Sequence, residues 1–151
     1  MLEFNVATTS QYSTSVAPLM GRILVAALFI ASGMTKLAAP TATQGYIASI
    51  GIPEPILAYV AAVVIELGGG VLLLLGYRVR YISLVLAAYC AITALLFHHA
   101  LGDQNQLFHF LKNLAIAGGL LMVFAFGAGA WSLDARGARV SAGVSRAGDQ
   151  H

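Results

Sequence analysis

Residues 56–76 read ILAYVAAVVIELGGGVLLLLG, an apolar stretch long enough to cross a bilayer with one carboxylate, Glu66, at its centre. At ~1.5 Å per helical residue, Glu66 would lie ~15 Å from either face of a ~30 Å hydrocarbon layer. An ionised side chain at that depth costs roughly 3 kcal/mol, so we expect it to be neutral or to face protein partners. Gly68, Gly69 and Gly70 follow it, and glycines let a neighbouring backbone or a flat ligand approach closely. The sequence therefore predicts a helix inside a bundle.

The composition of the chain indicates an integral membrane protein. Of 151 residues, 59% are hydrophobic and only 9% are charged, and the mean hydropathy is +0.83. A soluble domain of this length needs more polar surface. The net charge of +2 is explained by membrane topology, and no basic patch for nucleic acid is visible. The single cysteine, Cys90, excludes an intramolecular disulfide and a CxxC motif, so any redox chemistry must come from a partner.

The apolar pattern divides the chain into one membrane domain, residues 18–134, and two tails. Four spans are predicted within this domain, at about 18–39, 56–76, 81–98 and 107–127. Between the first two spans, residues 41–50 predict a short interfacial helix that Gly51, Pro53 and Pro55 end. Residues 1–17, rich in Ser and Thr, predict a mobile N-terminal tail, and residues 135–151 a disordered C-terminal tail.

The first span has a rival interpretation. Its uninterrupted apolar core is short and is bracketed by Arg22 and Lys36, which is also typical of a signal peptide cleaved after residue 39. Against this, the residues before the span include no basic side chain.

Four helices with short connections predict an all-α, antiparallel four-helix transmembrane bundle with both termini on one face. The face with the termini has six basic residues: Arg22, Arg78, Arg80, Arg136, Arg139 and Arg146. The other face has two, Lys36 and Lys112. Basic residues are enriched on the cytoplasmic side, so we expect a bacterial inner-membrane protein with both termini in the cytoplasm.

Two cations are candidate partners for Glu66. If each span is straight, Arg22 lies ~6 Å from the cytoplasmic face, Glu66 ~15 Å and Lys112 ~22 Å. Both gaps are within the reach of the long side chains, and the sequence does not choose between the two pairs. Lys36 is interpreted as an interfacial anchor. An ion pair of Glu66 that only fixes helix register is an alternative to a functional site.

The periplasmic half of the bundle holds most of the other polar candidates. His98 is expected to donate hydrogen bonds or transfer protons near a pocket, and Asn113 faces a different side of its helix from Lys112. The histidine spacing matches no zinc motif, so no metal site is predicted. We expect any small-molecule pocket to have Glu66 and the glycines at its floor and Lys112 and His98 above them. A quinone suits such a pocket, because its tail can lie in lipid while its carbonyls accept hydrogen bonds.

Several short motifs together resemble the DoxX family of small four-helix inner-membrane proteins. They are GRIL at 21–24, SGMTKL at 32–37, ELGGG at 66–70, FH at 97–98, FLKNL at 110–114 and WSLD at 131–134. The resemblance covers residues 18–134 and follows the family order at every helix. One departure is Ala128, where relatives often have proline.

The resemblance implies a redox setting without assigning an activity. The family is named after the small subunit of an archaeal thiosulfate:quinone oxidoreductase, and other members are associated with oxidoreductase and oxidative-stress complexes. It places Arg22, Lys36, Glu66, His98, Lys112 and Asn113 at motif positions and identifies no catalytic residue. Our first hypothesis is a membrane subunit of a quinone-linked oxidoreductase, with a protein partner that carries the redox cofactors. The alternatives are a scaffold or assembly protein without chemistry of its own and a carrier of small solutes or protons. The sequence leaves enzymatic activity and oligomeric state open.

Overall fold

The computed structural model describes residues 4–148, with side chains described for 16–139 and Ser141. Within this part of the chain all regular elements are helical. They are α1 (Phe4–Ala38), α2 (Pro40–Ser49), α3 (Pro55–Val63), the π-helical turn η1 (Val64–Gly68), α4 (Gly69–Leu75), α5 (Val79–Phe97), α6 (Gln104–Phe126) and α7 (Leu133–Gly148). Four helical segments are long and apolar enough to cross a membrane: Val16–Ala38, Pro55–Leu75, Val79–Phe97 and Gln104–Phe126. The predicted all-α membrane fold with four spans is confirmed.

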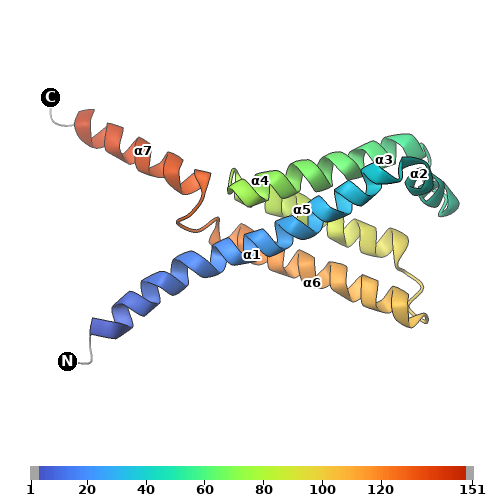
Figure 1. Ribbon diagram of the computed structural model, residues 1–151, viewed down its shortest axis with the longest axis horizontal. Helices are drawn as coiled ribbons and strands as arrows, with labels where there is room; N and C mark the ends of the chain where they lie inside the picture. Colours follow the sequence, from blue (N-terminus) through green and yellow to red (C-terminus); the bar gives the residue numbers. More distant parts are fainter. Residues whose placement is uncertain (1–3, 149–151) are drawn as a thin grey trace.

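The second span consists of α3, η1 and α4 in one continuous rod, and α1 crosses it (Figure 1). α5 and α6 pack against each other over most of their length. A small apolar core, which includes Ala26, Phe29, Leu73, Leu86 and Leu120, lies between the spans. Many large apolar side chains on the outer faces are exposed, as expected where lipid replaces water.

The turn between the second and third spans is fixed from both sides. Gly76 has φ +72° and ends α4, and its N–H donates to Leu73 O at 3.2 Å while Tyr77 N–H donates to Leu72 O at 3.1 Å. These two bonds form a Schellman motif, which favours glycine at the left-handed position. This tight turn makes the two spans antiparallel.

The carboxylate of Asp134 then caps the start of α5. It accepts from the backbone N–H groups of Arg78 at 2.7 Å and Val79 at 2.9 Å. The segment after α6 is thereby tied to the connection between the second and third spans.

Two of the three glycines predicted to pack closely do so. A Cβ on Gly70 would lie 2.9 Å from Ile30 Cγ1 and 3.3 Å from a backbone oxygen of α1, and one on Gly69 would lie 2.8 Å from Leu86 Cδ2. A Cβ on Gly68 would meet nothing within 4 Å, so no other described part of the chain packs closely against Gly68. The reason is helical rotation, since three consecutive residues cannot face the same neighbour.

Helix extends into both predicted tails. It begins at Phe4 in the N-terminal tail, residues 1–17, and α7 covers most of the C-terminal tail, residues 135–151. The mobility of the first tail and the disorder of the second stay predictions. Residues 4–17 contain no glycine or proline, and the helix continues through Pro18 into the first span. α7 begins with Ser132 Oγ accepting from Ala135 N–H at 3.1 Å, an N-cap hydrogen bond. Residues 1–3 and 149–151 lie outside the described part.

Candidate functional site

Glu66 lies in the middle of η1, which is the only π-helical turn in residues 4–148. A π-helical turn is wider than an α-helical turn and is frequent at functional sites. The second span therefore departs from regular helix where its single carboxylate occurs. Glu66 is 4% exposed.

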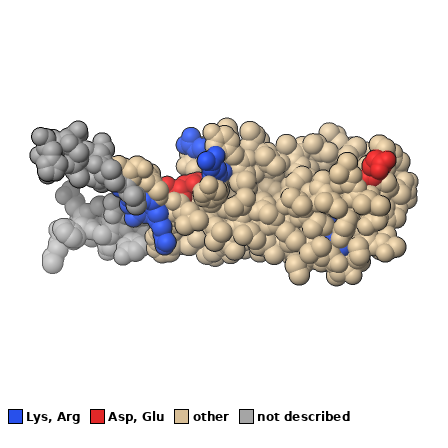
Figure 2. Space-filling view, turned by 90° about the horizontal axis from the view of Figure 1, so that it is seen from above, with Lys and Arg blue, Asp and Glu red and all other residues tan. Residues whose placement is uncertain are grey.

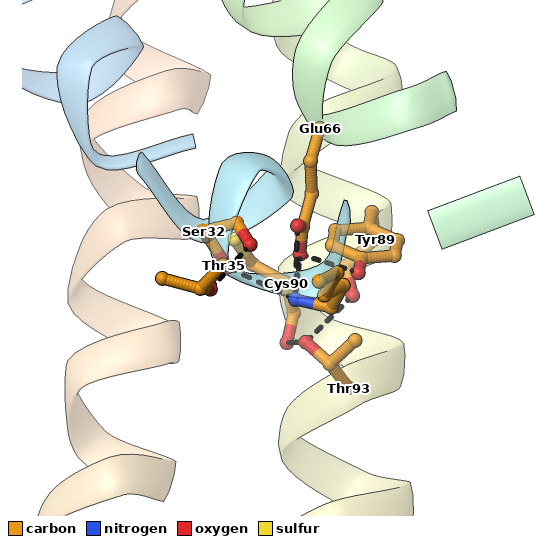
Figure 3. Close-up of polar contacts among 7 residues, drawn as sticks. Ser32, Thr35, Glu66, Tyr89, Cys90 and Thr93 are labelled. Carbon is orange, nitrogen blue, oxygen red and sulfur yellow. Dashed lines mark hydrogen bonds and ion pairs between the residues drawn. The ribbon is translucent and has the colours of Figure 1, made fainter. Parts of the chain in front are cut away.

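Three donor contacts converge on the Glu66 carboxylate. Lys36 Nζ of α1 lies 2.8 Å from Oε1 and 2.9 Å from Oε2, and the hydroxyl of Tyr89 in α5 donates to Oε1 at 2.7 Å. Lys36 Nζ also donates to Ser32 Oγ at 3.0 Å. Figure 3 shows Ser32, Glu66 and Tyr89 approaching one another from three different elements. Charge-assisted bonds of this kind are about twice as strong as neutral ones, so the group links α1, η1 and α5.

Neither cation proposed from the sequence pairs with Glu66, and the interpretation of Lys36 as an interfacial anchor is wrong. A side chain on a helix leans toward the N-terminus of that helix. Lys36 lies near the end of α1, so its side chain leans back toward the centre of the bundle. Arg22 and Lys112 lie near the beginnings of their spans, so their side chains lean away from the centre.

Lys112 and Arg22 accordingly have other contacts. Lys112 Nζ lies 3.0 Å from His109 Nδ1, one turn earlier on α6. Arg22 is 1% exposed and donates from Nη2 to the backbone oxygen of Trp131. Its Nη1 packs against Gly76, and within the described residues neither Nη1 nor Nε has a hydrogen-bond partner. Arg22 therefore belongs to the end of the bundle where the α6–α7 connection lies.

A cavity of about 480 Å³ opens beside the Glu66 network. Its lining is mainly apolar and comes from α1, α2, α3, η1, α5 and α6. Five of the six polar candidates line it: Lys36, Glu66, His98, Lys112 and Asn113. Arg22 and the three glycines of 68–70 do not.

The sequence interpretation missed several polar residues of the cavity, among them Ser32, Tyr89, Cys90 and Thr93. A signal for three of them was present. Ser32 precedes Lys36 by four residues and Tyr89 precedes Thr93 by four, and residues at this spacing share one helix face. Polar faces inside membrane spans are expected to point toward protein or a cavity.

A second polar group lies at the α5–α6 connection, farther along the cavity wall from Glu66. The rings of His98 and His109 are stacked with centroids 5.0 Å apart. His98 Nδ1 lies 2.9 Å from Gln106 Oε1, and Asn113 Nδ2 donates to His109 O at 3.0 Å. Within the described residues no three side chains of His, Cys, Asp or Glu are grouped to hold a metal ion. This group fixes the α5–α6 connection beside the cavity.

Comparison with known proteins identifies the family. The DoxX family profile matches residues 17–99. The chain is 37% identical over 119 residues to inner membrane protein YqjF of Escherichia coli (strain K12), which covers 79% of this chain and 90% of that protein. The chain belongs to the DoxX family. Inner membrane protein YphA of the same organism is 37% identical over 123 residues, covering 78% of this chain and 88% of that protein. No solved structure matches the chain.

Membership of this family makes the chain an inner-membrane protein. The matched segment, residues 17–99, contains the whole Lys36–Glu66–Tyr89 network. Lys112 and Asn113 lie beyond it. The relatives' names give a membrane and no activity, so function has to be argued from the cavity and the groups that line it.

Proposed function

We propose that the chain is the membrane subunit of a quinone-linked oxidoreductase and that the cavity holds the quinone head group. The observation that supports this most directly is the buried Lys36–Glu66–Tyr89 network, which forms one wall of an otherwise apolar cavity. A volume of about 480 Å³ lies in the range of ~300–1,000 Å³ usual for small-molecule sites, which combine apolar lining with a few placed polar groups.

The chemistry assigned to the chain is the binding of the head group and the handling of protons. One quinone takes up two electrons and two protons to give one quinol. The electrons come from a partner protein that carries a redox cofactor, because this sequence has no motif for one. Tyr89 O–H and Lys36 N–H are proton donors at the cavity wall, and Glu66 holds both in position. A donor that turns from Glu66 toward a carbonyl oxygen would bind the head group and give it a proton, and Glu66, once protonated from water, could replace that proton on the donor.

A scaffold function is the second candidate, and the completeness of the network favours it. The Glu66 carboxylate receives three contacts from within the chain, which is enough to explain its burial as a link between helices. A scaffold needs no ligand, so the two candidates differ in whether a quinone competes for this wall.

The proposed orientation has both termini in the cytoplasm and the cavity in the periplasmic half. The support is the count of six basic residues against two in the sequence. On the face drawn in Figure 2, the basic side chains gather mainly toward the end where the termini lie, and an acidic side chain lies at the other end.

The test is photolabelling of the full chain in membranes with a quinone analogue, followed by mapping of the modified peptides. Label is expected on the peptides of Ser32–Lys36 and Tyr89–Thr93 and should be displaced by free quinone. Tyr89→Phe and Glu66→Gln should each reduce displaceable labelling about tenfold, the effect of ~1.4 kcal/mol of lost hydrogen bonding.

Two matched control variants remove a tyrosine hydroxyl and a glutamate charge at positions outside the cavity. Tyr81→Phe deletes an exposed hydroxyl on the same helix as Tyr89, and Glu54→Gln neutralises an exposed carboxylate before the same span as Glu66. Both controls should label like the parent chain. Labelling that survives in the Tyr89 and Glu66 variants, or label confined to the segment around Arg78, would exclude this site and favour the scaffold.

A further inference from the structure

A second concave site lies at the opposite end of the bundle. It is a groove of about 330 Å³, here called the basic groove, between the start of α5 and the end of α6. Its lining residues are Arg78, Arg80, Tyr81, Gly127, Ala128 and Asp134. Val79 and Phe126 are the terminal residues of two spans, so the basic groove lies where the hydrocarbon layer ends. That is the level of lipid head groups.

The basic groove has cations without matching anions. Within residues 16–139 the one ion pair is Lys36 with Glu66, so Arg78 and Arg80 have no carboxylate partner there. The nearby Asp134 is engaged, because its two oxygens accept the N–H groups of Arg78 and Val79. Arg22 is buried behind the same turn, with Nη1 against Gly76. Two arginines and one engaged aspartate therefore line the groove, with the charge of Arg22 buried behind it, and the site favours an anion.

The side chain of Arg80 is placed to bind an anion in the groove, and Arg78 Cζ lies beside it, 5.9 Å from the centroid of the Tyr77 ring. Arg80 Nε lies 3.9 Å from the position of a Cβ on Gly127, so the guanidinium of Arg80 reaches across to the end of α6. Guanidinium groups bind phosphate oxygens in a forked geometry. The small residues Gly127 and Ala128 leave room on the opposite wall.

The surroundings of the basic groove select a lipid as the source of the anion. Tyr81 lines the groove and is 71% exposed, and Phe126, at the end of α6 next to Gly127 of the groove, is 77% exposed. Tyrosine at this level is typical of the membrane interface. Exposed apolar side chains of α5, including Leu84 and Val85, continue from there toward the centre of the span. Acyl chains can lie along this surface while the phosphate is held above it.

We propose that the basic groove binds the phosphodiester head group of an anionic phospholipid. Arg78 and Arg80 contact the phosphate oxygens, and Tyr81 packs at the junction of head group and acyl chain. This site is independent of the cavity at Glu66 and of whether that cavity binds a quinone.

The experiment is native mass spectrometry of the full chain in detergent with added dioleoylphosphatidylglycerol or dioleoylphosphatidylcholine. The anionic lipid should bind about tenfold more tightly than the zwitterionic one. Arg78→Gln/Arg80→Gln should abolish that preference, and Arg80→Gln alone should reduce it. Arg136→Gln removes the same charge from an exposed position outside the groove and should leave the preference unchanged.

Three outcomes would overturn the proposal. Equal binding of both lipids would show that the groove does not recognise an anionic head group. An equal loss in Arg136→Gln would show a diffuse effect of charge at this end of the molecule. Displacement of the lipid by millimolar inorganic phosphate would identify free phosphate as the ligand. Binding of phosphatidylcholine at the parent level serves as the folding control for the double variant.

Discussion

Replacing Lys36 by methionine tests the central ion pair, because it removes the charge and keeps a side chain of similar length. The variant loses the contacts of 2.8 and 2.9 Å to the Glu66 carboxylate, which then retains only the Tyr89 hydroxyl. Removing one partner of a buried pair typically costs about 3–5 kcal/mol. The Lys36 side chain is 24% exposed, so water can reach part of the vacated position. We expect a loss of about 2–4 kcal/mol in the free energy of unfolding.

A double-mutant cycle separates the pair from the loss of each side chain. Lys36→Met/Glu66→Leu leaves no unpaired charge and is expected to lie within about 1 kcal/mol of the parent chain. The coupling energy should then be at least ~2 kcal/mol. The assay is unfolding in mixed micelles of increasing SDS fraction, followed by circular dichroism. Lys112→Met, which removes an exposed lysine on the other side of the cavity, should change stability by less than about 0.5 kcal/mol. A Lys36→Met variant as stable as the Lys112→Met control would show that the ion pair between Lys36 and Glu66 does not stabilise the fold.

Three further changes test the packing and the orientation. Gly70→Ala should destabilise the chain by about 1–3 kcal/mol in the same assay, since the methyl group would meet a backbone oxygen of α1 at 3.3 Å, whereas Gly68→Ala should be neutral or stabilising. Gly76 and Gly51 both have positive φ, so alanine at either position should cost about 1 kcal/mol of unfolding free energy. Only Gly76→Ala adds a clash, so it should lose a further ~1 kcal/mol or more. Equal losses of stability in the two variants would contradict the packed turn at Gly76. A reporter that is active only in the cytoplasm should be active when fused after Asp134. If that reporter is silent and a reporter active only in the periplasm works at the same site, the proposed orientation is wrong.

The fold could be predicted from sequence because it depends on local pattern. Apolar length gives the four spans, and the short connections between them indicate that neighbouring spans are antiparallel. Glu66 was identifiable as a buried group because a charge at the centre of a span needs a partner. Each of these inferences depends only on residues that are close together in the sequence.

The partner of Glu66 could not be found by measuring depth along straight helices. That method counts Cα positions, and it favoured Arg22 and Lys112 over the correct residue, Lys36. The direction in which a helical side chain leans would have reversed the choice. The third member, Tyr89, depends on how α5 is rotated against the second span, and that rotation is set by tertiary packing.

The π-helical turn makes the length of the second span as important as its composition. Each residue of an α-helix advances the chain by about 100° around the axis. A π-helical turn uses about one residue more than an α-helical turn for the same rotation. Deleting one residue from Val64–Gly68 would therefore restore regular helix and leave α3 and α4 facing as they do now, whereas a deletion elsewhere in the second span would rotate its two parts by about 100°. The close contacts of Gly69 and Gly70 could then no longer be made together with the Glu66 network. Among related sequences, a change of one residue in the length of this span should therefore fall within Val64–Gly68.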